Sequence, residues 1–355
     1  MKAKRLWAVF LAVVCLLVSS QAAMAASVTN GDDSGPGSLR DAIASASDGD
    51  TITVDSRVKT INLKSSIEIS TNLEVRTSGL NIVGVRADRL FTVKSSVRFR
   101  NITFTGGKAF YANGGAVNVE GPYAKADFVN CTFFNNDAGE NGGAVCVNSM
   151  HHDATTFLNC TLAKNSATKG NGLAVLRGNV SLSACIVTGN EPLTHIPGAA
   201  YFDVYVTAPG IINAGRYNVI NKTNAAGSFL LTDGNHLNVT PERVFSELKL
   251  TEIKGVNVKV LKLLDSKNNL ALDLIPDNPS SAQWLPEDDQ VGTKRPQMGA
   301  YDAGSFELAP ATPGPGPSGE GSGEGSGEGS GGGCNSGLAG LALLSLLPLV
   351  LRRKD

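Results

Sequence analysis

The side chains best suited to chemistry lie in loops that follow a repeated NGGAV-type motif. These loops contain Glu120, the triplet His151-His152-Asp153 and Arg177. If successive motifs stack in register, the five side chains would lie side by side across three turns. They lack the facing carboxylate pair that glycoside hydrolysis needs, and the oxygen-lined Ca²⁺ site that β-elimination uses. We therefore expect solvated loops and predict no catalytic residue, metal or cofactor; a polar cluster of a carbohydrate-active enzyme is the alternative.

A second polar group lies near the end of the body of the chain, within residues 285–308. Asp288, Asp289 and Asp302 stand near Arg295 in this segment. We interpret these residues as turn and end-cap residues of a terminal motif, with a metal site as the alternative.

An internal repeat of about 29 residues defines the elements that would position these loops. One series has the pattern FxNCTF and the other the pattern NGGAV, and both keep the same register. The hexapeptides begin at Phe99, Phe128, Phe157 and Leu182, and the second series occupies residues 113–117, 141–145 and 171–175.

The apolar segments of this repeat are short, β-branched or aromatic, and alternate with period two. Gly, Asn and Asp separate them, and no long segment of helical period occurs within the repeat. Three short strands per repeat would form one turn of a parallel β-helix. We predict one all-β domain over residues 26–308 with about seven to nine turns, its clearest repeats lying at 97–190.

The asparagine in each hexapeptide gives a finer prediction. Phe99 and Ile102 are both apolar, so strict alternation must break at Asn101. Asparagine adopts the left-handed conformation more easily than most residues and can form a tight corner there. Stacked amides would then hydrogen-bond along the axis as a ladder of Asn101, Asn130 and Asn159. Two interior columns would lie behind it, one of Ile102, Cys131, Cys160 and Cys185, the other of Phe104, Phe133, Leu162 and Val187.

Residues 1–25 have the features of a secretory signal peptide. A basic start precedes an apolar run, Leu6–Val18, and small residues precede a cleavage point after Ala25. The run is shorter than the ~20 residues of a spanning helix. The mature chain is therefore expected to begin at Ala26 after export.

The C-terminal part has the composition of a linker and a sorting signal. Residues 309–333 are rich in Pro, Gly, Ser and Glu, which is typical of a flexible linker. Residues 334–355 contain an apolar run, Leu338–Leu351, and a basic end; as a helix the run spans ~21 Å, less than the ~30 Å hydrocarbon core. We predict sorting by an envelope protease near Gly333 and Cys334, with an uncleaved membrane anchor as the alternative.

Export also permits disulfides. Stacked residues on neighbouring turns lie ~4.8 Å apart, which is within the range for a bridge. Side chains of one column point the same way, however, and this is poor disulfide geometry. We expect buried free thiols; a Cys131–Cys160 or a Cys160–Cys185 bridge is the alternative.

Several of these motifs resemble known families. The repeats resemble those of polymorphic outer-membrane proteins, and residues 285–308 resemble the end of choice-of-anchor β-helix proteins. Residues 34–55 resemble the entry to secreted β-helix proteins, and GGGCN, GLAGLALL and LRRK resemble the C-terminal sorting tag of Synergistes-type diderm bacteria. The resemblance implies a single-stranded right-handed parallel β-helix with a short N-terminal capping helix at 34–50, and envelope attachment of the mature chain.

Composition and charge narrow the functional class. Hydrophobic residues make up 42% and charged residues 18%, which excludes a wholly disordered chain and a multi-span membrane protein. Without the charged residues at its two ends the chain has 25 basic and 31 acidic side chains, so no nucleic-acid partner is expected.

We therefore expect a non-catalytic cell-surface protein that is exported to the envelope and held in the membrane by its C-terminal segment. Its expected location is the outer membrane or the cell surface. It would bind a glycan or a surface protein. A carbohydrate-active enzyme, either a polysaccharide lyase or a hydrolase, and a structural surface component are the alternatives.

Overall fold

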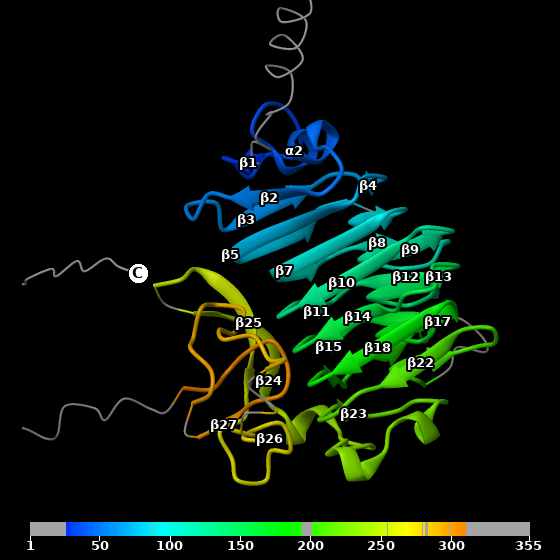
Figure 1. Ribbon diagram of the computed structural model, residues 1–355, viewed down its shortest axis with the longest axis vertical. Helices are drawn as coiled ribbons and strands as arrows, with labels where there is room; N and C mark the ends of the chain where they lie inside the picture. The colour runs from blue at the N-terminus through cyan, green and yellow to red at the C-terminus, as the bar shows by residue number, and fades with distance from the viewer. Residues whose placement is uncertain are drawn as a thin grey trace, which may run out of the picture. The chain divides into compact units, whose positions relative to one another are not determined.

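The computed structural model describes residues 26–309, except residues 87, 194–200, 254, 279, 281–282 and 298. Its parallel sheets stack as a β-solenoid of about six turns, which confirms the predicted all-β parallel β-helix (Figure 1). The expectation of seven to nine turns is wrong, because the chain leaves the solenoid near residue 240 and forms antiparallel hairpins. The predicted signal peptide with Ala25, and the sorting site at Gly333 and Cys334, lie outside the described residues.

The central turns pass through four faces, each a column of parallel strands. Face 1 contains β2 (Asp50–Val54), the first parts of β5 (Leu73–Gly84) and β7 (Ser96–Thr105), β10 (Lys125–Val129), β14 (Thr155–Leu158), β18 (Asn179–Ser183) and β22 (Ile211–Ala214). Face 2 contains β3 (Thr60–Leu63), the last parts of β5 and β7, β11 (Thr132–Phe134), β15 (Thr161–Ala163), β19 (Ile186–Val187) and β23 (Val219–Ile220). Face 3 contains β8 (Lys108–Ala109), β12 (Asp137–Asn141), β16 (Ser166–Lys169) and β20 (Glu191–Pro192). Face 4 contains β4 (Ile67–Ile69), β6 (Phe91–Val93), β9 (Val117–Gly121), β13 (Val145–Ser149), β17 (Leu173–Arg177) and β21 (Val204–Val206).

The corner between faces 1 and 2 lies at the predicted asparagines. Asn101, Asn130 and Asn159 have φ angles of 59°, 52° and 49°, in the left-handed region. This conformation reverses the inward–outward phase of the strand, so Phe99 and Ile102 both point into the solenoid and are fully buried. The predicted corner is therefore confirmed.

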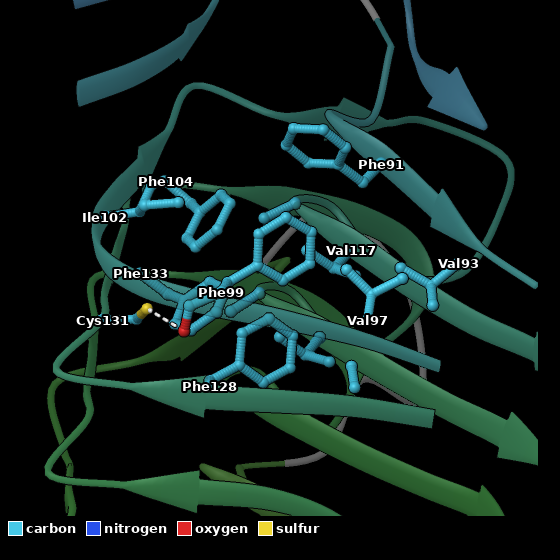
Figure 2. Close-up of a cluster of buried hydrophobic side chains, with 14 of the residues drawn as sticks. Phe91, Val93, Val97, Phe99, Ile102, Phe104, Val117, Phe128, Cys131 and Phe133 are labelled. Atoms are coloured by element: carbon cyan, nitrogen blue, oxygen red, sulfur yellow. Dashed lines mark hydrogen bonds between the residues drawn. The ribbon is translucent and has the colours of Figure 1, made fainter. Parts of the chain in front are cut away.

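Aromatic side chains fill the interior in stacked pairs from turn to turn. The rings of Phe99 and Phe128 lie 5.6 Å apart at 7°, and those of Phe104 and Phe133 lie 4.8 Å apart at 11°. Figure 2 shows these rings together with Cys131, whose thiol donates to the carbonyl of Phe99. The two predicted interior columns are buried throughout, which confirms them.

A short helix covers the N-terminal end of the solenoid, as the sequence predicts. Helix α2 (Leu39–Ser45) begins after Ser38, whose hydroxyl accepts a hydrogen bond from the backbone N–H of Asp41. Its apolar side chains Leu39 and Ile43 belong to the solenoid core, and β1 (Ser27–Val28) pairs with β2 beside it. No helix among the described residues is long and apolar enough to cross a membrane.

The part of the chain after residue 240 differs from the solenoid. A 3₁₀ turn, η3 (Pro241–Arg243), precedes an antiparallel hairpin of β24 (Phe245–Ile253) and β25 (Val258–Leu263). A second hairpin pairs β26 (Ile275–Pro276) with β27 (Ala300–Tyr301). Residues 241–264 therefore form a short 3₁₀ turn and a hairpin, not further strands of the solenoid.

The terminal motif 285–308 packs against the side of the solenoid, not against its end. Three threonines stand in register on the outer side of face 2, at positions 103, 132 and 161. Gln290 bridges Thr103 and Thr132, and the backbone N–H of Ser305 donates to Thr161 Oγ1 at 3.0 Å. The predicted end-cap position is thus wrong: face 2 has an outward polar column, and the terminal motif satisfies its hydrogen bonds.

Candidate functional site

The outer surface of face 4 brings together two members of the predicted polar cluster. Parallel pairing places Asn148 of β13 beside Glu120 of β9 on one side and beside Arg177 of β17 on the other. Glu120, Asn148 and Arg177 therefore lie in one row across three successive turns, as the sequence predicts for Glu120 and Arg177. They line a pocket of about 440 Å³, called here the face 4 pocket, whose lining residues are Lys94, Glu120, Gly121, Pro122, Asn148, Met150 and Arg177.

The charged groups of the face 4 pocket differ in how far they are already paired. Lys94 Nζ lies 2.7 Å from Glu68 Oε2, and this contact raises the pKa of Lys94. Glu120 Oε2 accepts a hydrogen bond of 2.6 Å from Asn118 Nδ2. Arg177 is exposed and has no carboxylate within 4 Å in the described part of the chain. One guanidinium is therefore free to bind an anion from solution.

The histidines of the predicted cluster lie elsewhere, in the loop between β13 and β14. The rings of His151 and His152 stack at 4.7 Å, and His152 Nε2 lies 3.3 Å from Asp153 Oδ1. Asp153 also lies 3.9 Å from the ammonium group of Lys125. These three residues do not line the face 4 pocket, so the predicted cluster divides into two groups.

The histidine group has the side-chain types of a transition-metal site. The candidate ligand atoms of His151, His152 and Asp153 lie within 4.8 Å of one another. However, His151 Nδ1 already accepts the backbone N–H of Asp153 at 3.0 Å, and the nearby Lys125 carries a positive charge. The prediction of no metal at this cluster stays a prediction.

The predicted asparagine ladder is present in part. Asn130 Nδ2 donates to Asn101 Oδ1 at 3.1 Å. Asn130 also donates to the carbonyl of Asp288 at 2.7 Å, and Asn159 turns its amide towards Gly304 of the terminal motif. The ladder therefore ends at Asn130, because the amide of Asn159 donates to the carbonyl of Gly304 in the terminal motif instead of to Asn130.

A longer ladder, which sequence reasoning missed, lies at the next corner. Asn136, Asn165 and Asn190 are buried, and each donates its amide Nδ2 to the side-chain oxygen of the following member at 2.8–2.9 Å. The last acceptor is Asp203, and burial raises the pKa of this carboxyl to about 6. The three asparagines lie six residues after the first-corner positions 130, 159 and 184. The sequence repeat therefore contained the information needed to predict this second ladder.

The cysteines behind the first corner form a buried column. Cys131, Cys160 and Cys185 are free, and each thiol donates to the backbone carbonyl of a phenylalanine one turn earlier, at 3.3–3.5 Å. Cys146 is buried and free as well, and burial raises the pKa of its thiol to about 12. The expectation of buried free thiols agrees with this arrangement, and the two alternative disulfides are absent among the described cysteines.

The polar group of the terminal motif is a buried charge network. The guanidinium of Arg295 donates to the carbonyls of Asp302 and Gly304, and lies 3.4 Å from Glu307. Asp289 accepts the backbone N–H groups of Val291 and Thr293 and is fully buried, whereas Asp288 points to Lys294 at 2.8 Å. The sequence identified Arg295 and the three aspartates but missed Glu307.

Large exposed side chains accompany the face 4 pocket. Met150, which lines it, is 60% exposed, and Tyr123 follows the lining residue Pro122 and is 75% exposed. Exposed apolar groups beside hydrogen-bonding groups are typical of a binding surface. No protein-family model matches this chain, and searches of curated proteins and of solved structures gave no match.

Proposed function

We propose that this chain is an exported, envelope-anchored β-helix protein whose face 4 pocket binds glycans or surface proteins without catalysing a reaction. Export is supported by the signal-peptide pattern of residues 1–25. Anchoring is supported by the linker 309–333 and the short apolar, basic-ended segment after it. The partner for maturation is an envelope sorting protease, and the location is the outer membrane or cell surface.

The observation that carries the binding proposal is the register of Glu120, Asn148 and Arg177. A carboxylate, an amide and a guanidinium on three successive turns offer hydrogen-bond acceptors and donors along one line. The strands that hold them belong to a packed solenoid, so their backbone positions are fixed before binding and only the side-chain rotamers must be ordered. Repeated polar groups on a rigid face suit an extended ligand.

The lining of the face 4 pocket favours binding over hydrolysis. It contains one carboxylate, Glu120. Glycoside hydrolysis uses two carboxyl groups about 5–10 Å apart, one as acid and one as base or nucleophile. The other nearby carboxylate, Glu68, lies outside the lining and is paired with Lys94, so the pocket can hold a sugar through hydrogen bonds but lacks a free second carboxylate for this reaction.

The binding proposal is tested with a panel of bacterial and host glycans and the purified full-length protein. We compare it with a pocket variant, Glu120→Gln with Asn148→Ala and Arg177→Gln. The matched control carries Glu247→Gln, Asn213→Ala and Arg216→Gln, which remove the same groups at exposed positions outside the pocket. We expect the wild type and the control to bind a glycan of the panel, and we expect the pocket variant to lose this binding. Equal retention by all three proteins contradicts the assignment of the pocket, and shortened or unsaturated sugar products contradict the absence of catalysis.

Anchoring is tested by the mass of the mature protein isolated from the native envelope, with tandem mass spectra of its C-terminal peptide. A chain that starts at Ala26 and ends near Gly333 or Cys334 is expected. An intact tail through Asp355 would contradict sorting and leave a simple membrane anchor.

A further inference from the structure

We propose that the ligand of the face 4 pocket is a carboxylated glycan, a chain containing uronic acids, and that Arg177 binds its carboxylate. This inference rests on the proposed glycan binding and adds the chemical class of the sugar. It follows from which polar groups of the pocket are already paired within the protein and which are free.

The pairing pattern gives the pocket two chemically different ends. At the first end, Lys94 is held by Glu68 at 2.7 Å, so one cation and one anion compensate each other. Glu120 adds a second carboxylate there, with one oxygen bound to Asn118 and the other available to accept a sugar hydroxyl. An anionic group is disfavoured at this end, whereas a hydroxyl group is favoured.

The opposite end has an excess of positive charge. Arg177 is exposed on the last strand of the pocket and makes no ion pair with any described residue, and Asn148 beside it is exposed too. A guanidinium presents its N–H groups as a planar fork that matches the two oxygens of a carboxylate. Since the amide of Asn148 can donate a further hydrogen bond, a carboxylate fits this end better than a neutral hydroxyl.

The remaining lining suits the ring of a sugar. Pro122 and the exposed thioether side chain of Met150 form an apolar part of the pocket against which C–H groups can pack. The volume of about 440 Å³ lies within the usual range for small-molecule sites. From Lys94 to Arg177 the pocket crosses four turns, which is ~14 Å at the strand spacing. This length suits a short oligosaccharide better than a single small anion.

Isothermal titration tests the proposal with the full-length protein and a pair of probes of equal length. The probes are an oligogalacturonate and the same oligomer with its carboxylates methyl-esterified. We expect the acid form to bind at least about tenfold more tightly than the ester, because charge-assisted hydrogen bonds are about twice as strong as neutral ones. Arg177→Gln is expected to abolish this preference, and the control Arg216→Gln, which removes one exposed guanidinium outside the pocket, is expected to keep it.

The outcomes separate this inference from the function on which it rests. Equal affinity for acid and ester overturns the carboxylate assignment but leaves glycan binding intact. An acid preference that survives in Arg177→Gln overturns the role of Arg177. Failure to bind the oligogalacturonate, its ester and every glycan of the panel overturns both proposals.

Discussion

Glu307 and Arg295 face each other at 3.4 Å inside the terminal motif, with side chains that are 1% and 0% exposed. Asp289 and Asp302 are buried nearby and interact electrostatically with Arg295, but among the described residues only Glu307 lies within ion-pair distance of its guanidinium. Most carboxylate oxygens accept backbone N–H groups, which partly offsets the cost of burying their charge. Because this network lies in the segment that covers face 2, its charge state affects how firmly that segment is held.

The charge network around Arg295 predicts that the free energy of unfolding decreases as the pH rises towards 8. Burial raises the pKa of Glu307 to about 7 and that of Asp302 to about 6, although Arg295 opposes both shifts. A raised carboxyl pKa means that the folded state binds more protons than the unfolded chain. The resulting contribution to the free energy of unfolding is complete at pH values below the pKa of the unfolded chain, and it is lost as the pH rises through 6 to 7. For Glu307 the loss is on the order of 3 kcal/mol.

The measurement is the urea midpoint between pH 5 and pH 8. We expect a decrease in the wild type and a smaller decrease in Glu307→Gln, where Asp302 and Asp203 still titrate. Identical slopes for the two proteins would show that Glu307 is already ionised at pH 5.

Removal of the cation at the centre of the network should be costly. Arg295→Ala leaves Glu307 without its ion-pair partner and removes the positive charge near Asp289 and Asp302. It also leaves the carbonyls of Asp302 and Gly304 without a donor. Breaking a buried ion pair on one side costs about 3–5 kcal/mol. Chemical denaturation at pH 8 measures this loss, and the exposed variant Arg216→Ala should change stability by less than about 0.5 kcal/mol. A loss of under about 1 kcal/mol for Arg295→Ala would mean that the network does not stabilise the folded chain.

The sequence repeat was sufficient to predict the solenoid, but it could not predict the terminal motif 285–308 that packs against face 2. Phe99, Asn101 and Ile102 determine the first corner through local sterics and alternation, and these rules need no long-range information. The turn-to-turn spacing also places Glu120 beside Arg177 through the intervening Asn148, because stacked parallel strands transmit register. These parts of the fold and the site could therefore be predicted.

Contacts between distant segments could not be predicted in this way. Gln290 lies 187 residues from Thr103, and no periodicity links the two. His151 and His152 were predicted to lie beside Glu120 because their loops occupy equivalent positions in successive turns. The loop after β13 instead brings the neighbouring Asp153 close to Lys125. A loop position fixes the turn to which a side chain belongs but not the direction in which it points.

The second ladder predicts that Asn165 contributes more to stability than an exposed asparagine. Its Oδ1 accepts the backbone N–H and the amide of Asn136, and its Nδ2 donates to Asn190 at 2.8 Å. Asn165→Ala leaves a buried backbone N–H without a partner, which costs about 2 kcal/mol or more. Thermal unfolding compared with Asn213→Ala, at an exposed position of β22, measures the difference. Equal melting temperatures would mean that water replaces the missing amide.

The buried cysteines predict thiols that do not react in the folded protein. Cys131, Cys146, Cys160 and Cys185 are inaccessible, and burial raises the pKa values of Cys146 and Cys160 above the usual range. Since the thiolate is the reactive species, iodoacetamide at pH 8 should leave these four residues unmodified until the chain is unfolded. Peptide mass spectrometry measures the labelling, and the variant Asn148→Cys provides an exposed thiol that should react at once. Labelling of the column as fast as this introduced thiol would show that the solenoid opens readily, and peptides joined by a disulfide would contradict the free-thiol arrangement.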